Sequence, residues 1–98
     1  MFLKVDDGET DLFAPAMRDL SAIVEKLEGA SNLRYGPNED FENSTPGYTH
    51  GFIIGFDSPA ALATYANDAD HRAVGARLVA MCTGGKDGIS VFDIVTYG

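Results

Sequence analysis

The sequence has little of several features that would define a protein class at once. Cys82 is its single cysteine, so no internal disulfide can form and no C-x-x-C pair is available to hold a metal. Nothing in it resembles a signal peptide, and it has no run of about 20 apolar residues that could span a bilayer. We therefore expect a cytoplasmic protein in which Cys82 is a buried structural thiol.

Basic residues are also scarce. Seven lysines and arginines stand against fifteen aspartates and glutamates, giving a formal net charge of -8. Such a charge repels phosphate backbones and anionic lipid surfaces. The sequence therefore predicts neither a nucleic-acid partner nor a membrane partner.

What remains is the composition of an ordinary globular chain. Hydrophobic residues make up 45% and charged residues 22% of the 98 positions, and we find no internal repeat, low-complexity tract or shift in composition. We expect one domain over residues 1–98. A domain of this size buries only about two-thirds of its unfolded surface, so a partner surface would help to stabilise it.

Hydrophobic spacing and capping residues predict three helices. A stripe of apolar residues three and four positions apart predicts an amphipathic helix from about Phe13, limited by Pro15 and ended by Gly29. Ser58 and Pro59 predict the start of a short alanine-rich helix over residues 60–66. Asn67 and Asp68 interrupt it, and Asp68 is placed to cap a further helix that reaches Met81 and ends at Gly84 and Gly85.

Four segments are typical of strands. Alternation of bulky and small residues is clearest over 48–56, and the other candidates are 2–5, 32–35 and 89–95, with a polar loop over 36–47. The resulting order predicts an α+β, ferredoxin-like, antiparallel four-stranded sheet with helices on one face. A second copy of the sheet would cover the other face, so we expect a homodimer that closes a dimeric α+β barrel.

The residues best suited to chemistry are His50, Tyr65 and His71. On one unbroken helix Tyr65 and His71 would point in different directions, but the break at Asn67 and Asp68 allows them to share a site. The helix N-terminus disfavours a protonated His71, whereas nearby carboxylates favour it, so the sequence leaves its ionisation open. A neutral imidazole beside a phenol could act as a base whose product oxyanion the phenol stabilises.

Structural interpretations of the same residues also stand. His71 could be a surface or capping residue at a helix start, and Tyr65 and His50 could be core residues with satisfied polar atoms. Asp68 and Asp70 lie close to His71 in the sequence, but no H-x-x-x-H or similar spacing supports a metal site. We predict neither a metal nor a cofactor.

Several short motifs together resemble a known family. They are Gly47-Tyr-Thr-His-Gly-Phe52, then Phe56-Asp-Ser58, then Tyr65 with His71 six residues later, and finally Val91-Phe-Asp93. The pattern is similar to that of the stress-responsive A/B barrel (Dabb) domain. This resemblance implies a small homodimer with the ferredoxin-like fold.

The resemblance also implies candidate roles. A few members of the family are polyketide cyclases, among them a plant enzyme that makes olivetolic acid through a cofactor-free aldol condensation of a linear poly-β-ketone. His71 and Tyr65 match the histidine and tyrosine which that enzyme uses, and His50 and Phe52 match positions that line its pocket.

Two main hypotheses follow. In the first, the chain is a cyclase-like enzyme in which His71 is the base and Tyr65 orients a carbonyl oxygen; its apolar pocket is lined by Phe13, Met17, His50, Phe52, Tyr65 and His71. In the second, it is a non-catalytic, stress-related homodimer that binds a small apolar ligand or a protein partner. A cofactor-free monooxygenase is a third class that the fold permits.

Overall fold

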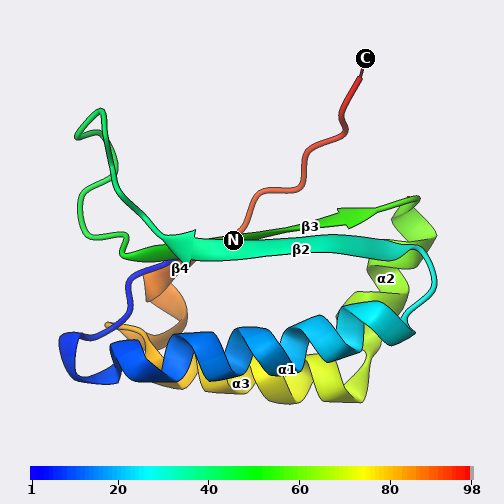
Figure 1. Ribbon diagram of the computed structural model, residues 1–98, viewed down its shortest axis with the longest axis horizontal. Coiled ribbons are helices and arrows are strands. Elements are labelled where there is room, and N and C mark those ends of the chain that lie inside the picture. Colours follow the sequence, from blue (N-terminus) through cyan, green and yellow to red (C-terminus); the bar gives the residue numbers. More distant parts are fainter. Residues whose placement is uncertain (98) are drawn as a thin grey trace.

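An antiparallel sheet lies above helices α1 and α3 in the computed structural model, which describes residues 1–97 (Figure 1). The strand order is β2-β3-β1-β4, which confirms the predicted α+β, ferredoxin-like class. The elements are β1 Phe2–Leu3, a 3-10 helix Asp7–Leu12, α1 Phe13–Lys26, β2 Ala30–Pro37, β3 His50–Phe56, α2 Pro59–Asn67, α3 Ala69–Met81, a second 3-10 helix Gly85–Gly88 and β4 Ile89–Ser90.

The helix boundaries follow from local capping chemistry. The Ser58 side chain accepts a hydrogen bond from the Ala61 amide, with proline at the first helical position of α2. Asp68 ends α2 and caps α3 by accepting a hydrogen bond from the His71 amide at 2.9 Å. α1 begins at Phe13, so Pro15 falls in its first turn, where a missing amide hydrogen has no intrahelical acceptor to lose.

The hydrophobic core lies between the helices and the sheet. Its largest fully buried side chains are Leu3, Met17, Leu20 and Met81, which come from β1, α1 and α3. Cys82 is buried as well and belongs to the same cluster. Burial in an apolar environment raises the pKa of the Cys82 thiol, so the thiol stays protonated at neutral pH, as a structural cysteine would.

Strand β3 carries two different faces. Phe52 points toward the helices and is buried, whereas Ile53 on the opposite side of the sheet is 62% exposed. Gly51 and Gly55 flank Ile53 on that outer side, next to Phe2 of β1, whose register partner is Gly51. We call this outer surface the open face. Within residues 1–97 no helix covers it (Figure 1).

The strand lengths differ from the prediction. Strand β1 ends at Leu3, and Val5 makes only an isolated bridge to Cys82. The segment predicted as 32–35 is longer, because β2 pairs with β3 along Ala30–Pro37 around a register shift. α1 ends before Gly29, which occupies the following turn with φ +84°.

The final strand was predicted to reach Val95, and this was wrong. β4 ends at Ser90, although the residues that follow are β-branched and aromatic. A strand needs a neighbouring backbone for its hydrogen bonds, and the described part of the chain offers none to residues 91–97. Figure 1 shows this segment leaving the sheet on the side opposite the helices.

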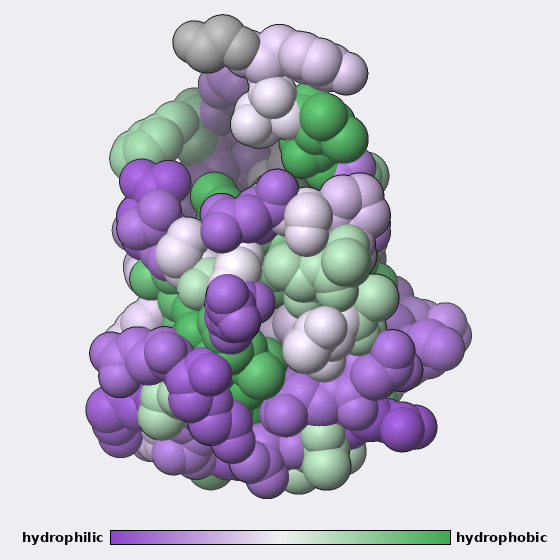
Figure 2. All heavy atoms as spheres, turned by 90° about the vertical axis from the view of Figure 1, so that its right-hand side faces the viewer, coloured by the Kyte–Doolittle hydropathy of each residue, from purple (hydrophilic) through white to green (hydrophobic). Residues whose placement is uncertain are grey.

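The segment is also apolar. In Figure 2 the segment of residues 91–97 stands above the body of the molecule, with hydrophobic atoms near its base, while the surface over the helices below is largely hydrophilic.

In the described residues, each helix is too short or too polar to cross a lipid bilayer.

Candidate functional site

The structure brings Tyr65 and His71 into direct contact. Tyr65 lies near the end of α2 and His71 in the first turn of α3, with the capping residue Asp68 between the two helices. Their ring centroids are 3.9 Å apart and the ring planes are inclined by 36°. The break at Asn67 and Asp68 makes this possible, since six positions on a continuous helix would place the side chains on different faces.

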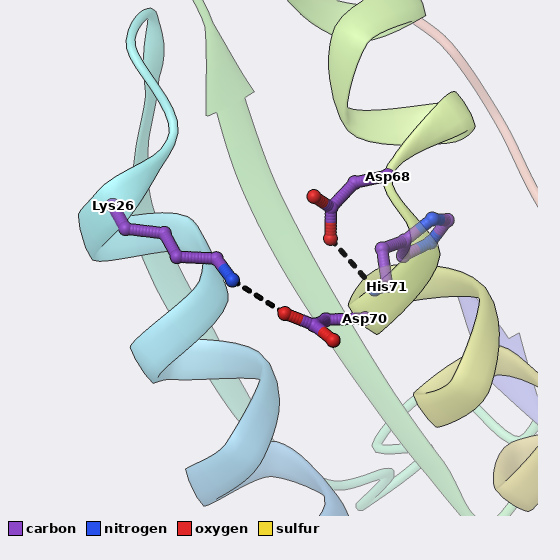
Figure 3. Close-up of polar contacts among 4 residues, drawn as sticks. All are labelled: Lys26, Asp68, Asp70 and His71. Atoms are coloured by element: carbon purple, nitrogen blue, oxygen red, sulfur yellow. Dashed lines mark hydrogen bonds and ion pairs between the residues drawn. The ribbon is translucent and has the colours of Figure 1, made fainter.

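His71 has one nitrogen without a partner. Its Nδ1 is buried and has no hydrogen bond of good geometry within residues 1–97, although the backbone groups of Ala66 and Tyr65 lie close enough to the ring to favour its protonated form. Figure 3 shows why Asp68 does not supply one: the Asp68 carboxylate binds the backbone amide of His71, and the imidazole points away from it. Buried polar atoms are nearly always hydrogen-bonded, so this nitrogen has an unused capacity to bind a polar group or a proton.

The ionisation of the pair follows mainly from burial. Desolvation lowers the pKa of His71, while the nearby backbone groups of Ala66 and Tyr65 and the Asp68 carboxylate oppose that shift in part. Desolvation also raises the pKa of Tyr65 to about 12. At neutral pH the site therefore contains a neutral imidazole beside a protonated phenol.

An ion pair ties α3 to α1 close to this site. Lys26 Nζ lies 2.5 Å from the Asp70 carboxylate, one residue before His71 (Figure 3). The pair is exposed, so it contributes little to stability in water. No sequence pattern indicates Lys26 as a neighbour of this site, because α1 and α3 are brought together only by the fold.

His50 lies elsewhere, at the opposite end of β3. Its ring centroid is 4.5 Å from that of Phe13, and its Nδ1 is 2.8 Å from the Thr49 hydroxyl. Burial lowers the pKa of His50. Tyr65 instead contacts Phe56, with ring centroids 5.0 Å apart. His50 and Phe56 are the first and last residues of β3, roughly 20 Å apart at the usual strand rise.

The six predicted pocket residues therefore do not line one pocket. Four of them form two separate clusters, and the other two are core residues between these clusters. Phe13 and His50 make one cluster and Tyr65 and His71 the other, while Met17 and Phe52 are buried core residues. Phe56 joins Tyr65 and was missed, although the alternation of β3 places it on the same face as His50 and Phe52.

Two hollows of the structure lie away from both clusters. One of about 310 Å³ lies between α1 and α3, and one of about 350 Å³ lies between α1 and β2; neither is lined by any of the six predicted residues. Among residues 1–97, no group of three or more histidine, cysteine or acidic side chains is arranged to hold a metal ion.

Comparison with known proteins adds a family and two similar structures. The family model for the stress responsive A/B barrel domain matches residues 1–96. A crystal structure from Jannaschia sp. CCS1, described as a dimeric ferredoxin-like protein of unknown function, is 38% identical, with a TM-score of 0.92 over 97% of this chain and 93% of that one. No curated protein sequence matches the chain.

A more distant structure shares the fold. A crystal structure of a protein from Arabidopsis thaliana is 22% identical, with a TM-score of 0.72 over 83% of this chain and 80% of that one. At this level of identity the likeness supports the ferredoxin-like arrangement alone.

Proposed function

Because the chain belongs to the stress-responsive A/B barrel domain family, we propose that it is a homodimer in which Tyr65 and His71 transfer protons on a carbonyl compound without a cofactor. The observation that carries this proposal is the buried, unpartnered Nδ1 of His71 in a ring that packs on Tyr65. A neutral base beside a protonated phenol is a pairing that suits enolate chemistry, since the base can accept a proton and the phenol can donate a hydrogen bond to the enolate oxygen.

The reaction class that fits is an aldol-type cyclisation of a poly-β-ketone. His71 would remove a proton from a carbon between two carbonyl groups, and the resulting enolate oxygen would accept a hydrogen bond from the Tyr65 hydroxyl. The enolate carbon would then attack a distant carbonyl carbon of the same chain. The new alkoxide would take back the proton held by His71, leaving the enzyme unchanged.

The residues around the pair supply the apolar surroundings in this proposal. We assign contacts with the substrate to His50, Phe52, Phe13 and Met17, which follow the inner side of β3 and α1. Because these side chains pack closely and both hollows lie elsewhere, a substrate would have to part them on entry. Binding of the substrate should therefore slow amide hydrogen exchange more around β3 and α2 than at the edges of the sheet.

The homodimer is supported by the open face and by a relative. The Jannaschia protein, 38% identical to this chain, is described as dimeric. Ile53 and Phe2 are exposed on the open face, which an identical sheet could cover. A reducing cytoplasm suits the protein, because its only cysteine is a buried free thiol.

The catalytic proposal is tested by proton exchange on a β-diketone. We expect the wild-type protein to speed deuterium uptake at the central carbon, measured by NMR, because that carbon carries the acidic proton. His71→Gln should lower the rate enhancement by about 10²-fold or more, and Tyr65→Phe by about 10-fold or more. Tyr97→Phe is the control and should retain the activity, because Tyr97 is exposed and is not among the residues assigned to the site.

Circular dichroism would show that each variant is folded. Wild-type protein that gives no acceleration with a range of β-diketones, or a His71→Gln variant as fast as wild type, would refute the catalytic role.

A second function is favoured by a different observation. The rings of Phe56, Tyr65 and His71 pack against one another, and neither hollow reaches them. The chain would then be a non-catalytic homodimer that binds a small apolar ligand or a protein partner. In that case Tyr65→Phe and His71→Gln would lower the free energy of unfolding with no activity to lose.

A further inference from the structure

Tyr65 is the main anchor of helix α2. It is the one residue of this helix that is buried. The polar side chains of α2 bond back to their own helix, because Thr64 Oγ1 donates to the Ala60 carbonyl and Asn67 Nδ2 donates to the Ala63 carbonyl. The position of Tyr65 therefore depends on the groups that pack against its ring rather than on polar contacts of the helix that carries it.

The Tyr65 hydroxyl has no hydrogen bond within residues 1–97 that would orient it. Desolvation by burial is the only cause that raises the pKa of Tyr65 to about 12. The direction of the phenol is therefore set by the two rings that flank it. The ring centroid of His71 lies 3.9 Å away and that of Phe56 lies 5.0 Å away. Aromatic rings in contact favour particular mutual geometries.

The two flanking rings are attached to firmly held parts of the fold. Phe56 is the last residue of β3, and its register partner in β2 is Ala30. His71 belongs to α3, which two ion pairs connect to α1. Tyr65 thus lies between a ring of the sheet and a ring of a helix that is tied to its neighbour.

The role assigned to Tyr65 requires that its hydroxyl be held in place. A group that stabilises a developing oxyanion must already lie at the position of that oxygen, and a displacement of about 1 Å can cost on the order of 10²-fold in rate. Such groups are held by packing against rigid elements of the fold. Phe56 is the side chain of the sheet that supplies this packing.

We infer that Phe56 is the positioning residue of Tyr65: its ring, fixed in the sheet, holds the phenol against the imidazole of His71. This inference rests on the proposed function, in which the Tyr65 hydroxyl stabilises the enolate oxygen. Phe56 acts through Tyr65 and does not touch the reacting atoms. Ser58, two residues after Phe56, caps α2, so one short segment sets both the start of the helix and the ring contact of its anchor.

The experiment combines the deuterium-uptake assay with NMR on four variants of the full-length protein. Phe56→Leu removes the ring and keeps an apolar side chain. Phe41→Leu makes the same change at a residue that is 93% exposed and is the matched control. Tyr65→Phe keeps the ring and removes the hydroxyl, and the fourth variant combines Phe56→Leu with Tyr65→Phe. If Phe56→Leu fails to fold, Phe56→Met replaces it, because a methionine side chain adapts to irregular gaps.

The rates test whether Phe56 acts through Tyr65. We expect Phe56→Leu to slow deuterium uptake about 10-fold, as Tyr65→Phe does, and Phe41→Leu to react at the wild-type rate. The double variant should be no slower than Tyr65→Phe, because it has no hydroxyl to position. Losses that multiply to about 100-fold in the double variant would overturn the inference, since Phe56 would then act independently of Tyr65.

The NMR spectrum reports the position of the rings without reference to activity. In wild type and in Tyr65→Phe the two rings should show nuclear Overhauser contacts, and the imidazole protons of His71 should be shielded by the neighbouring ring. In Phe56→Leu both signs of contact should weaken. Unchanged contacts between Tyr65 and His71 in Phe56→Leu would overturn the inference.

The two proposals fail in different ways. An active wild-type protein, together with a Phe56→Leu variant of the same rate and the same ring contacts, would overturn the inference and leave the proposed function standing. A wild-type protein that does not speed deuterium uptake would overturn the proposed function. In that case weakened ring contacts in Phe56→Leu would still support the positioning of Tyr65, and retained contacts would overturn it.

Discussion

At the scale of single residues, the ionisation of His71 links its burial to stability. In the folded chain the pKa of His71 lies below 6.5, the ordinary value that we expect in the unfolded chain. At a pH between the folded and the unfolded pKa, the unfolded chain therefore binds a proton that the folded chain does not. The free energy of unfolding should therefore be at its full value above about pH 6.5 and fall as the pH drops through this window.

Urea unfolding at about pH 7.5 and about pH 5 would measure this fall. His71→Gln should lose less stability on acidification than wild type, because glutamine does not titrate. His50→Gln is the comparison, since burial also lowers the pKa of His50. An identical loss in wild type and in His71→Gln would mean that His71 is accessible to water and protonates freely.

The pairing of Tyr65 with His71 could be predicted from the sequence, whereas the position of His50 relative to them could not. The helix break is written locally in Asn67 and Asp68, and it decides that the two rings can meet. The distance from His50 to the pair depends on where α2 and α3 pack along β3, and no local pattern encodes that. The burial that lowers the pKa of His71 likewise comes from tertiary packing.

At the scale of elements, the start of α3 depends on a single side chain. Asp68 accepts a hydrogen bond from the His71 amide, so Asp68→Ala should lower the free energy of unfolding by about 1 kcal/mol. Asp68→Asn keeps a capping oxygen and should lose less than about half of that. The variants would be compared by thermal and urea unfolding.

The same two variants separate capping from charge. In the wild-type chain the Asp68 carboxylate raises the pKa of His71. Both variants remove this carboxylate, so the midpoint of an NMR titration of His71 should fall in both. If Asp68→Asn destabilised the chain as much as Asp68→Ala, the carboxylate charge rather than the cap would be the stabilising feature.

The helices were predicted more accurately than the strands, for a physical reason. Ser58, Asp68 and the spacing from Phe13 act within one or two turns, so their signals are local. A strand exists only where another backbone meets its hydrogen-bonding groups. That is why β2 is longer than its composition indicated, and why Val91 to Val95 do not form a strand within the chain.

At the scale of the whole molecule, the net charge opposes association. Each chain carries a formal charge of -8, and the proposed interface on the open face is formed by apolar groups such as Ile53 and Phe2. Added salt screens the repulsion between copies without weakening apolar contacts. The dissociation constant of the dimer should therefore fall when sodium chloride is raised from about 20 mM to about 300 mM.

Sedimentation at the two salt concentrations would measure this change. Ala76→Glu adds one negative charge outside the proposed interface and should show a slightly larger salt effect than wild type. A dimer that dissociates as salt is added would instead be held together by ion pairs between the copies.

The strand order also sets when the molecule can fold. Strand β1 lies between β3 and β4, so the second and third residues of the chain pair with residues near position 90. This contact spans almost the entire sequence, and such distant contacts slow folding. During synthesis, β1 can pair with β3 once residues 50–56 have left the ribosome, but its other edge remains unpaired until β4 follows. The sheet is therefore completed only at the end of synthesis, when β4 closes the edge that β1 has left open.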